Sequence, residues 1–582
     1  MNRIIYIAVL AFLLTACNDD FLERYPIAEI SPENSFQTAQ DLKLYTNSFY
    51  NDLSLANDIV RGDKISDNVL YNGVPDEQSG LRIVPSKAGS GGWSWGDLRK
   101  INTFFKYYQQ CDDEQARKEY SGVSRFFRAY FYFEKVKRFG DVPWYNEVIG
   151  STNEELLTKP RDSRVLVMDS IIADLNQAIE NLNSDKASDK ITKWTALALK
   201  SRVCLFEGTF RKYHDNLNLP NADELLQLSY EAAEKLINEG PYTIYSSGST
   251  SNDYRDLFSS LKVKENEAIL ARRYDNALDI MHNINYYFIS ATQEDIGLSK
   301  TLINSYLMSD GTSFTNQGGF ETMEFLQETT SRDKRLEQTI RTPGYTRIGG
   351  AQVLAPDFSA SMTGYQMTKF VTDESMDGDG TSYQDIAIIR FAEVLLNYAE
   401  AKAELGLFTQ SDADKSIKLL RNRVGMPNLN VDNANASPDA YLAAQYPNVT
   451  GAKAGVILEI RRERRVELAM EGFRYDDLMR WKNGKLLEEY ITGMYFPSVG
   501  EFDMDGDGLF DVLLYEGAEP VSTASQKIEL GDIFKLTNGA SGNLVAFTDR
   551  IKIFDEERDY LYPIPSGDIL LNPNLKQNLN WE

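Results

Sequence analysis

Apolar residues spaced by three and four positions are the feature that most constrains the fold of this chain. One such stripe predicts an amphipathic helix from about Arg164 to Asn183. The stripe consists of Val165, Met168, Ile172, Leu175, Ile179 and Leu182. The next segment, Thr192 to Glu207, has the same spacing, and its small residues allow close contact between helices. The pattern predicts a mainly α-helical chain in which neighbouring helices form pairs.

Two further helix pairs are expected in the C-terminal half. Their members are Phe391 to Leu405 with Ala413 to Arg423, and Val456 to Glu471 with Arg474 to Glu489. Gly406 and Gly472 separate the partners. Pairs of this kind look like tetratricopeptide repeats, although no strict period of about 34 residues is present. Long stretches without helical period, Ser309 to Gln384 and Tyr490 to Asp549, are expected to hold function or to cover it.

The N-terminus predicts export and lipid attachment. A short basic start, an apolar run from Ile4 to Leu14 and the sequence Leu14-Thr15-Ala16-Cys17 resemble a bacterial lipobox. The run is too short to span a membrane, since a spanning helix needs about 20 apolar residues. Residues 1–16 are therefore predicted to be removed, Cys17 to be lipidated, and residues 17–30 to form an extended tether before a helix start at Ser31-Pro32. The alternative is an ordinary signal peptide with an incidental cysteine.

Composition excludes several classes of function. The 61 basic and 86 acidic residues give a formal net charge of −25, which opposes binding to nucleic acid or anionic lipid headgroups. A neutral ligand, a cation or a basic patch on a partner fits this charge. The other two cysteines, Cys111 and Cys204, lie in helical patterns and are expected to be buried free thiols. His214 and His282 are the only histidines, which nearly excludes a zinc site made of histidines.

Two tryptophans stand in a glycine-rich loop. The sequence Gly92-Trp93-Ser94-Trp95-Gly96 matches the G-x-S-x-G of serine hydrolases, but a flexible loop precedes it where that motif requires a strand. The tryptophans are more informative, because large rings in such a loop need a cover. They form either a stacking platform for the C–H faces of sugars or part of the core.

An acidic loop near the C-terminus has the ligand spacing of a calcium site. Asp503, Asp505, Asp507 and Asp511 occupy positions 1, 3, 5 and 9 of a calcium loop, with Gly508 at position 6. Leu514 stands at position 12, where a bidentate glutamate is expected, so the alternative is an acidic hairpin turn. The segment from Asp377 to Gly380 is a weaker copy that includes Asp379.

The basic run from Arg461 to Arg465 is predicted to be structural. Glu463, Glu467 and Glu471 follow a spacing of four on the same helix and would neutralise the arginines. A nucleic-acid patch is the weaker interpretation in an exported acidic protein.

Taken together, the motifs resemble the SusD/RagB lipoproteins of Bacteroidetes over almost the whole chain. The matching segments are Cys17 to Glu23, Ser31 to Phe36, Arg128 to Glu134, Phe139 to Trp144, Lys193 to Lys200, Ile389 to Ala401, Leu420 to Arg423, Glu463 to Arg474, Asp477 to Trp481, Tyr562 to Pro565, Asn572-Pro573 and Gln577-Asn578. The resemblance implies a mainly α SusD-like fold in which four tetratricopeptide-like helix pairs scaffold loop-rich binding regions, with a few short strands. It implies one unit over residues 31–582, with an N-terminal part over about 31–240 and a C-terminal part over about 265–582.

The resemblance also implies a function. Such proteins capture nutrients at the cell surface for a TonB-dependent (SusC-like) outer-membrane barrel, without breaking a bond, and Asp19-Asp20 resembles their surface-export signal. An oligosaccharide is the expected ligand, and some relatives take peptides. The expected binding residues are Trp93, Trp95, Asp67, Tyr71, Arg82, Tyr286 and Tyr287. No cofactor is expected apart from structural calcium. The alternatives are a glycosidase using two carboxylates and an adaptor that binds protein through its helix pairs.

Overall fold

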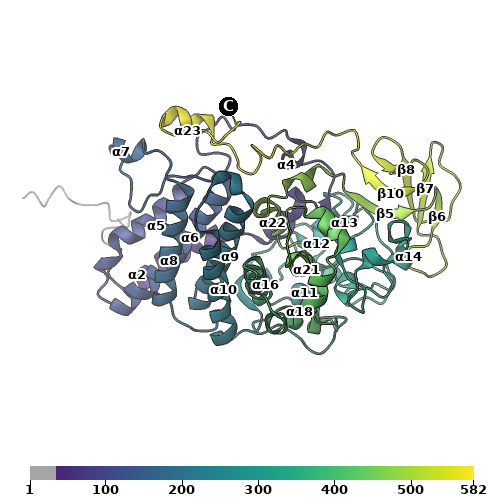
Figure 1. Ribbon diagram of the computed structural model, residues 1–582, viewed down its shortest axis with the longest axis horizontal. Helices are drawn as coiled ribbons and strands as arrows, with labels where there is room; N and C mark the ends of the chain where they lie inside the picture. The colour runs from purple at the N-terminus through teal and green to yellow at the C-terminus, as the bar shows by residue number, and fades with distance from the viewer. Residues whose placement is uncertain (1–34, 582) are drawn as a thin grey trace, which may run out of the picture.

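The computed structural model describes residues 35–581, and most of their regular structure is α-helical (Figure 1). The predicted mainly α fold is confirmed. The predicted signal peptide over 1–16, the lipidated Cys17, the tether over 17–30 and the helix start at Ser31-Pro32 lie outside the described residues. The first described helix, α2 (Ala39–Asn47), begins at Thr38, whose hydroxyl accepts a hydrogen bond from the N–H of Asp41 while the Asp41 carboxylate accepts one from the N–H of Thr38.

The long helices pack in a row that joins the two halves of the chain (Figure 1). In the order of contact the row is α5, α6, α8, α9, α10, α16 and α21. Their bounds are Gly96–Tyr107, Glu114–Phe139, Arg164–Asn181, Lys193–Tyr213, Ala222–Glu239, Phe391–Glu404 and Ala454–Glu467. One apolar cluster runs through this row and contains side chains from Phe36 to Leu575. Residues far apart in the sequence therefore share a core.

Helix α8 shows how polar residues shift a predicted stripe. Met168 and Leu175 are buried as predicted, but Ile171 and Ala178 are buried in place of Ile172 and Ile179. The buried face also contains polar side chains, namely Asp174, which pairs with Arg128 at 2.6 Å, and Arg164, which pairs with Glu207 at 2.7 Å. A stripe defined by apolar residues alone does not include these buried polar contacts.

The C-terminal helices are shorter than predicted. The predicted helix over 413–423 is divided at Ser416 into α17 (Gln410–Lys415) and α18 (Ile417–Arg423). Helix α21 ends at Glu467, because Met470 and Gly472 adopt positive φ angles of 63° and 79°. The following helix, α22, covers only Arg474–Arg480, and the 3₁₀ turn Gly484–Glu488 follows it.

Short helices and small strand pairs fill the regions between the long helices. The helices are α3 (Ala56–Arg61), α4 (Asp76–Ser79), α7 (Glu154–Leu157), α11 (Asp253–Ser259), α12 (Ile284–Ile289), α13 (Lys300–Ser305), α14 (Phe325–Glu328), α15 (Lys334–Glu337), α19 (Val431–Ala436), α20 (Ala440–Gln445) and α23 (Ser566–Leu571). The strand pairs are β1 (Val69–Leu70) with β3 (Gly297–Leu298), and β2 (Ala268–Arg272) with β4 (Ile386–Arg390).

A six-stranded sheet stands at the end of the molecule opposite to α2 (Figure 1). Its strands are β5 (Thr492–Phe496), β6 (Gly500–Phe502), β7 (Val512–Glu516), β8 (Gln526–Leu530), β9 (Phe534–Leu536) and β10 (Gly542–Ala546). The spatial order is β5-β10-β9-β8-β7-β6. Strands β7 and β8 are parallel, with Val512 opposite Gln526, whereas β6 pairs with β7 in antiparallel fashion. The stretch from Tyr490 to Asp549, which lacks helical period, is thus mostly this sheet.

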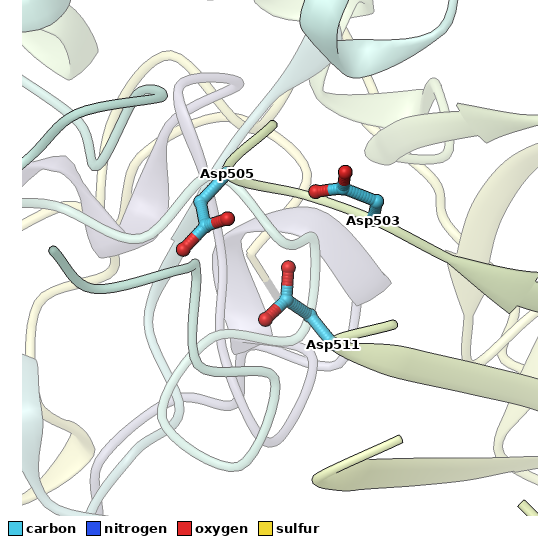
Figure 2. A group of neighbouring side chains, drawn as sticks. All are labelled: Asp503, Asp505 and Asp511. Atoms are coloured by element: carbon cyan, nitrogen blue, oxygen red, sulfur yellow. The ribbon is translucent and has the colours of Figure 1, made fainter. Parts of the chain in front are cut away.

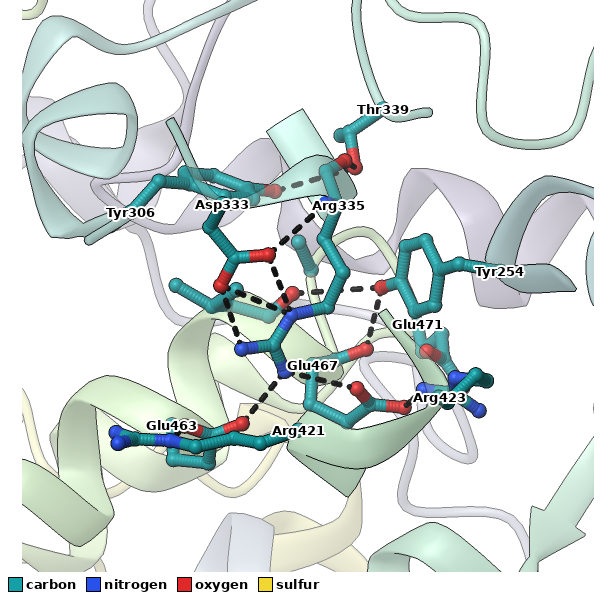
Figure 3. A network of polar contacts seen from close by, with 12 residues as sticks. Tyr254, Tyr306, Asp333, Arg335, Thr339, Arg421, Arg423, Glu463, Glu467 and Glu471 are labelled. Carbon is teal, nitrogen blue, oxygen red and sulfur yellow. Dashed lines mark hydrogen bonds and ion pairs between the residues drawn. The ribbon is translucent and has the colours of Figure 1, made fainter. Parts of the chain in front are cut away.

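The charged residues of α21 form buried ion pairs, as predicted, but their partners come from other segments. Glu463 accepts hydrogen bonds from Arg335 at 2.6 Å and from Arg421 at 2.8 Å (Figure 3). Glu467 pairs with Arg335 at 3.0 Å, with Arg390 at 2.7 Å and with Arg423. Spacing of four along the helix is therefore not what neutralises these charges.

The basic run of α21 is likewise buried. Arg462 pairs with Asp439, Arg464 with Asp477 at 2.8 Å, and Arg465 with Asp67 at 2.9 Å. These contacts tie α21 to segments before and after it in the chain, so the run is structural.

Candidate functional site

An open cleft of about 700 Å³ lies beside the N-terminal part of the row of helices. Its volume falls in the range of about 300–1,000 Å³ that is usual for ligand sites. We call it the N-terminal cleft. Its lining residues are Asn57, Asp58, Arg61, Lys64, Ile65, Tyr71, Val74, Pro75, Asp76, Glu77, Arg82, Ile83, Pro85, Gly91, Arg138, Tyr562 and Pro563. Two of the predicted binding residues, Tyr71 and Arg82, are among them.

One wall of the cleft is built around Tyr562. The Arg138 guanidinium lies 3.6 Å from the centre of the Tyr562 ring, and that of Arg82 lies 4.6 Å from it. The Tyr562 hydroxyl donates a hydrogen bond to Glu77 at 2.7 Å. Arg138 is fixed further by its Nε, which donates to the carbonyl oxygen of Gly91 at 2.8 Å. The Tyr562 ring thus packs against both guanidinium groups and holds them in this wall.

Arg82 supports this wall more than it faces the cleft. The residue is only 8 % exposed, and its Nη2 donates to the carbonyl oxygen of Asp559 at 2.7 Å. It also pairs with the Asp559 carboxylate at 2.8 Å and lies 5.3 Å from the Trp581 ring. Asp559 thus occupies Nη2 of Arg82, and burial limits the access of ligand hydroxyls to Nε and Nη1, which have no hydrogen-bond partner among the described residues.

A second group of cleft residues consists of Tyr71 and two cations. The Lys64 Nζ lies 4.1 Å from the centre of the Tyr71 ring and 2.8 Å from Glu294. Arg61 also pairs with Glu294, and its guanidinium lies 4.8 Å from the Tyr287 ring. Burial and the nearby Glu294 raise the pKa of Tyr71, so its hydroxyl stays protonated and can donate a hydrogen bond at neutral pH.

Tyr286 and Tyr287 lie on α12 and do not line the cleft. Tyr287 reaches it only through Arg61, and the Tyr286 hydroxyl lies 3.4 Å from that of Thr292. The structure thus places Tyr287 against Arg61, a residue of the cleft, and Tyr286 beside Thr292, which does not line it.

Trp93 and Trp95 form an aromatic cluster within the protein. Trp93 is 2 % exposed, and its ring meets those of Phe139 at 4.8 Å and Trp95 at 5.3 Å, both edge-to-face. The expectation that the loop presents both rings outward is wrong for Trp93, because α6 carries Phe139 directly onto it. Trp95 is half-buried and packs on Phe131 and Tyr145. Neither tryptophan lines the N-terminal cleft.

Asp67 is an internal ion-pair partner. It lies 2.6 Å from Arg474 and 2.9 Å from Arg465. Burial alone would raise the pKa of this carboxyl, but the two guanidinium groups outweigh it and lower the pKa to about 2. Both oxygens of Asp67 accept hydrogen bonds from these guanidinium groups, which leaves fewer acceptor positions for the ligand hydroxyls expected from the sequence.

Sequence reasoning missed Arg61, Lys64, Arg138 and Tyr562 as cleft residues. Arg138 and Tyr562 lie next to or within segments that resemble the family, Phe139 to Trp144 and Tyr562 to Pro565, which was the available signal. More than 400 residues separate them in the chain, so their meeting follows from the fold alone.

The acidic loop lies between β6 and β7, so it is a hairpin turn as well as a candidate cation site. The carboxylates of Asp503, Asp505 and Asp511 lie within 4.8 Å of one another and surround a small space (Figure 2). Burial and the neighbouring Asp505 and Asp503 raise the pKa of Asp511, which reflects uncompensated negative charge. Asp507 is exposed and accepts a hydrogen bond from the N–H of Leu509 at 2.7 Å. Three of the four predicted ligands therefore come together.

The other candidate chemistries are accounted for by protein contacts. Asp377 is paired with Arg347 at 2.6 Å, and Asp379 accepts a hydrogen bond from Asn283 at 2.7 Å, so the weaker copy of the acidic loop is not an open carboxylate cluster. Ser94 follows a loop, since residues 81–93 contain no strand, and it lacks the geometry of a hydrolase elbow.

The expected burial of the two thiols is confirmed, and both histidines are buried as well. Cys111 and Cys204 are buried free thiols. The Nε2 of His214 lies 2.8 Å from the carbonyl oxygen of Met479, and that of His282 lies 3.0 Å from that of Gln384. Burial lowers the pKa of each histidine to about 4, so both are neutral at pH 7. Within residues 35–581, none of the helices has the length and apolar character needed to cross a bilayer.

Comparison with known proteins identifies the fold. The chain is 23 % identical to the SusD-like protein P2 of Formosa agariphila, over 98 % of this chain and 97 % of that protein. It is 24 % identical to a SusD-like protein of Bacteroides ovatus over 47 % of this chain and 50 % of that protein. A SusD-like protein of Bacteroides fragilis has a similar structure, with a TM-score of 0.70 and 21 % identity, over 96 % of this chain and all of that one.

A second solved structure from Bacteroides fragilis, described as a SusD-like carbohydrate binding protein, has a TM-score of 0.69 and 21 % identity over 94 % of this chain and all of that one. Two family profiles match the chain. One, described as starch-binding and associating with the outer membrane, matches residues 96–205. The profile of the SusD family matches residues 266–581, which is more than half of the sequence. This chain therefore belongs to the SusD family.

Proposed function

We propose that this protein is a non-enzymatic lipoprotein of the outer cell surface that captures a nutrient glycan in the N-terminal cleft. It then delivers the glycan to a TonB-dependent outer-membrane barrel. Membership of the SusD family supports this proposal, as does the likeness to a structure described as a carbohydrate binding protein. The observation that carries it is the cleft itself, whose open volume combines rings, cations and carboxylates in one place.

The chemistry of the cleft suits a polyhydroxylated ligand. Tyr71 offers a ring against which the C–H face of a sugar can pack, and Val74 and Pro75 extend that apolar surface. Asp58 and Asp76 have no ion-pair partner among the described residues, so their carboxylates are available to accept hydrogen bonds from hydroxyl groups. Arg138 can donate from the guanidinium nitrogens other than the Nε that binds Gly91. Binding would then require no bond to break.

Calorimetric titration with a panel of oligosaccharides tests the proposal. Tyr71→Ala should weaken binding of any glycan that binds the wild type by about five-fold or more, since a stacked ring contributes on the order of 1 kcal/mol. Tyr286→Ala is the matched control, because Tyr286 is equally a half-buried tyrosine but does not line the cleft. Equal affinities for the wild type and the Tyr71 variant would place the binding site elsewhere.

Peptides remain the second ligand class for the same cleft. Titration with a mixture of short peptides separates the two, because a peptide-binding protein should show no heat with any of the sugars. Incubation with polysaccharide and assay for new reducing ends tests the glycosidase alternative. An increase in reducing ends that depends on the protein would contradict a purely binding role.

We propose further that Cys17 is lipidated and anchors the protein to the outer membrane. Cys17→Ala should leave the protein soluble or unprocessed, whereas the wild type should sediment with outer membranes. Wild-type protein that is released by a salt wash would contradict lipid anchoring.

An exposed apolar face next to the cleft supports docking to a barrel partner. Leu81, Ile83, Leu570 and Leu571 are 69–85 % exposed, and the N–H of Ser566 bonds to the carbonyl oxygen of Pro85 at 2.8 Å, which holds their two segments together. Replacing Leu570 and Leu571 by serine should reduce co-purification of the barrel in mild detergent without changing glycan affinity. Unchanged co-purification would show that another face makes the contact.

We also propose that Asp503, Asp505 and Asp511 bind a structural Ca²⁺ ion. Three carboxylates that converge from one hairpin fit the preference of this ion for oxygen ligands.

A further inference from the structure

Strand β8 has one unpaired edge. The N–H of Gln526 donates to the carbonyl oxygen of Asp511 at 2.9 Å, on the side of β7. Because main-chain groups alternate in direction along a strand, the N–H and C=O of Lys527 and the N–H of Glu529 point to the other side. Among residues 35–581, these three groups have no hydrogen-bond partner. Such an edge is a template for another strand.

The neighbouring strand β9 leaves this edge open, because it begins only beside the last residue of β8. β9 pairs with β8 only at Leu530 and Phe534, where the N–H of Gly531 donates to the carbonyl oxygen of Phe534 at 2.8 Å. From there β9 continues beyond the end of β8 and pairs with β10. On the side of β8 away from β7, no described strand therefore pairs with Gln526 to Glu529.

That position is a groove of about 750 Å³. It is lined by residues 357–359, 525–529 and 531–534. The N–H of Phe358 donates to the side-chain oxygen of Gln526 at 2.7 Å, which fixes the segment 357–359 to β8. Phe358, Ile528 and Phe534 give the lining apolar surface. The five residues of β8 correspond to about 17 Å of extended chain.

The charge of the groove is negative. Asp357, Glu529 and Asp532 line it, and none of them has an ion-pair partner in the described part of the chain. The single cation in the lining, Lys527, is paired with Glu519 at 2.5 Å. Three uncompensated carboxylates favour a basic occupant.

We propose that this groove binds a basic, extended peptide segment of another protein, which adds to the sheet as a strand beside β8. Lys527 and Glu529 supply the main-chain hydrogen bonds of this β-augmentation. Alternating side chains of the peptide then pack on Phe358 and Phe534 or face the carboxylates. A second copy of this chain is a poor occupant, since two identical acidic grooves would repel each other.

The probe is a fluorescein-labelled pentapeptide of alternating valine and lysine, and binding is followed by fluorescence anisotropy with the full chain. A second peptide has the same sequence but carries N-methyl groups on alternate amides. It keeps the side chains and the charge and cannot form the ladder. We expect the N-methylated peptide to bind at least ten-fold more weakly, because several main-chain hydrogen bonds are lost together.

A variant tests the groove from the side of the protein. Lys527→Pro removes the N–H that faces the groove and leaves the pairing with β7, to which Lys527 contributes no hydrogen bond. Lys527→Ala is the matched control, since it removes the same ammonium group and retains the N–H. The proline variant should bind the unmodified peptide several-fold more weakly than the alanine variant.

Several outcomes would overturn the proposal. Equal binding of the two peptides by the wild type would mean attraction by the net negative charge alone, and this arm needs no variant that might alter folding. Equal binding by the two folded variants would place the peptide elsewhere. A dimer in light scattering that Lys527→Pro dissociates would make a second copy the occupant.

Discussion

At the residue scale, two neighbouring tryptophans differ in what they contribute. Trp93 is enclosed by Phe139 and Trp95, whereas Trp95 keeps part of its ring at the surface and covers Phe131. The two tryptophan rings belong to one aromatic cluster, which holds the loop of residues 88–92 against α6. The loop in turn supplies Gly91, which holds Arg138 at the cleft. The tryptophans thus affect the site through packing.

Trp93→Ala should lower the free energy of unfolding by about 3–5 kcal/mol, since it removes a fully buried ring and leaves a cavity. Trp95→Ala should cost less, because that ring is only partly buried. Urea denaturation followed by circular dichroism measures both. If the Trp93 variant has wild-type stability but does not bind glycan, Trp93 contributes to binding directly and is not only a core residue.

The identity of buried partners explains why residue roles were difficult to predict. Asp67 has the residue type of a ligand for hydroxyl groups, but Arg465 and Arg474, about 400 positions away, occupy its carboxylate. Tyr71, by contrast, lines the N-terminal cleft, and its predicted role in ligand binding stays a prediction. Residue type restricts what a side chain can do, and distant parts of the chain decide what it does.

At the element scale, a close contact between two glycines joins the turn after α3 to the segment after α21. Gly62 follows α3 with an ordinary φ of −59°, but a Cβ on it would lie 2.7 Å from the Cα of Gly472. Gly62→Ala should therefore destabilise the protein by about 1–3 kcal/mol through overpacking. It should also weaken glycan binding, since the turn Gly62–Ile65 carries Lys64.

The control for this prediction is Gly96→Ala. Gly96 begins α5, and a Cβ on it would meet no atom within 4 Å. This variant should be as stable as the wild type or more stable, because alanine is the better helix former. Equal stability of the two variants, measured by urea denaturation, would contradict the importance of the close approach.

The hairpin between β6 and β7 gives the prediction for calcium. If Asp503, Asp505 and Asp511 bind Ca²⁺ in the folded state only, calcium should raise the melting temperature by an amount that grows with its concentration. Asp505→Asn should abolish the increase, and Asp507→Asn should preserve most of it, since Asp507 lies outside the cluster. Identical melting curves in calcium and in chelator would mean that the hairpin is merely acidic.

Elements with strong periodicity were predictable, and elements held by long-range contacts were not. The spacing of apolar residues gave α16 nearly to both ends and α9 at its start, but α9 continues to Tyr213, beyond the predicted end at Glu207. It did not give the break at Ser416 or the early end of α21, where the N–H of Met470 donates to Asp63 at 3.0 Å. Strand β8 alternates polar and apolar residues from Lys527 to Leu530, which is a local signal for a strand that the helical periodicity does not include.

At the scale of the whole molecule, buried titratable groups should make stability fall in two stages as the pH falls. The pKa of Asp67 and of Glu400 is lowered to about 2, because Arg465 and Arg474 in the first case and Arg480 in the second outweigh burial. The ordinary values are near 4, so this stabilisation is complete above about pH 4.5 and is lost between about pH 4.5 and 2. That is the acid stage.

The histidines produce an earlier stage. Burial lowers the pKa of His214 and of His282 to about 4, while the unfolded chain binds protons near its ordinary value of about 6.5. Between these values the unfolded state holds more protons, so the free energy of unfolding falls as the pH is lowered from about 6.5 to 4. The slope is at most about 1.4 kcal/mol per pH unit for each histidine.

Urea denaturation at half-unit intervals from pH 7.5 to 4.5 measures the histidine stage. His214→Gln cannot titrate and keeps a donor for the carbonyl oxygen of Met479, which accepts a hydrogen bond from Nε2 of His214 at 2.8 Å. Even if the substitution lowers stability at every pH, it should remove the contribution of one histidine, at most about 1.4 kcal/mol per pH unit between pH 6.5 and 4.5, while His282 still titrates. A slope equal to that of the wild type would show that His214 stays neutral in both states over this range or is protonated in both. The decline would then have to come from the buried carboxylates, whose loss is expected only at lower pH.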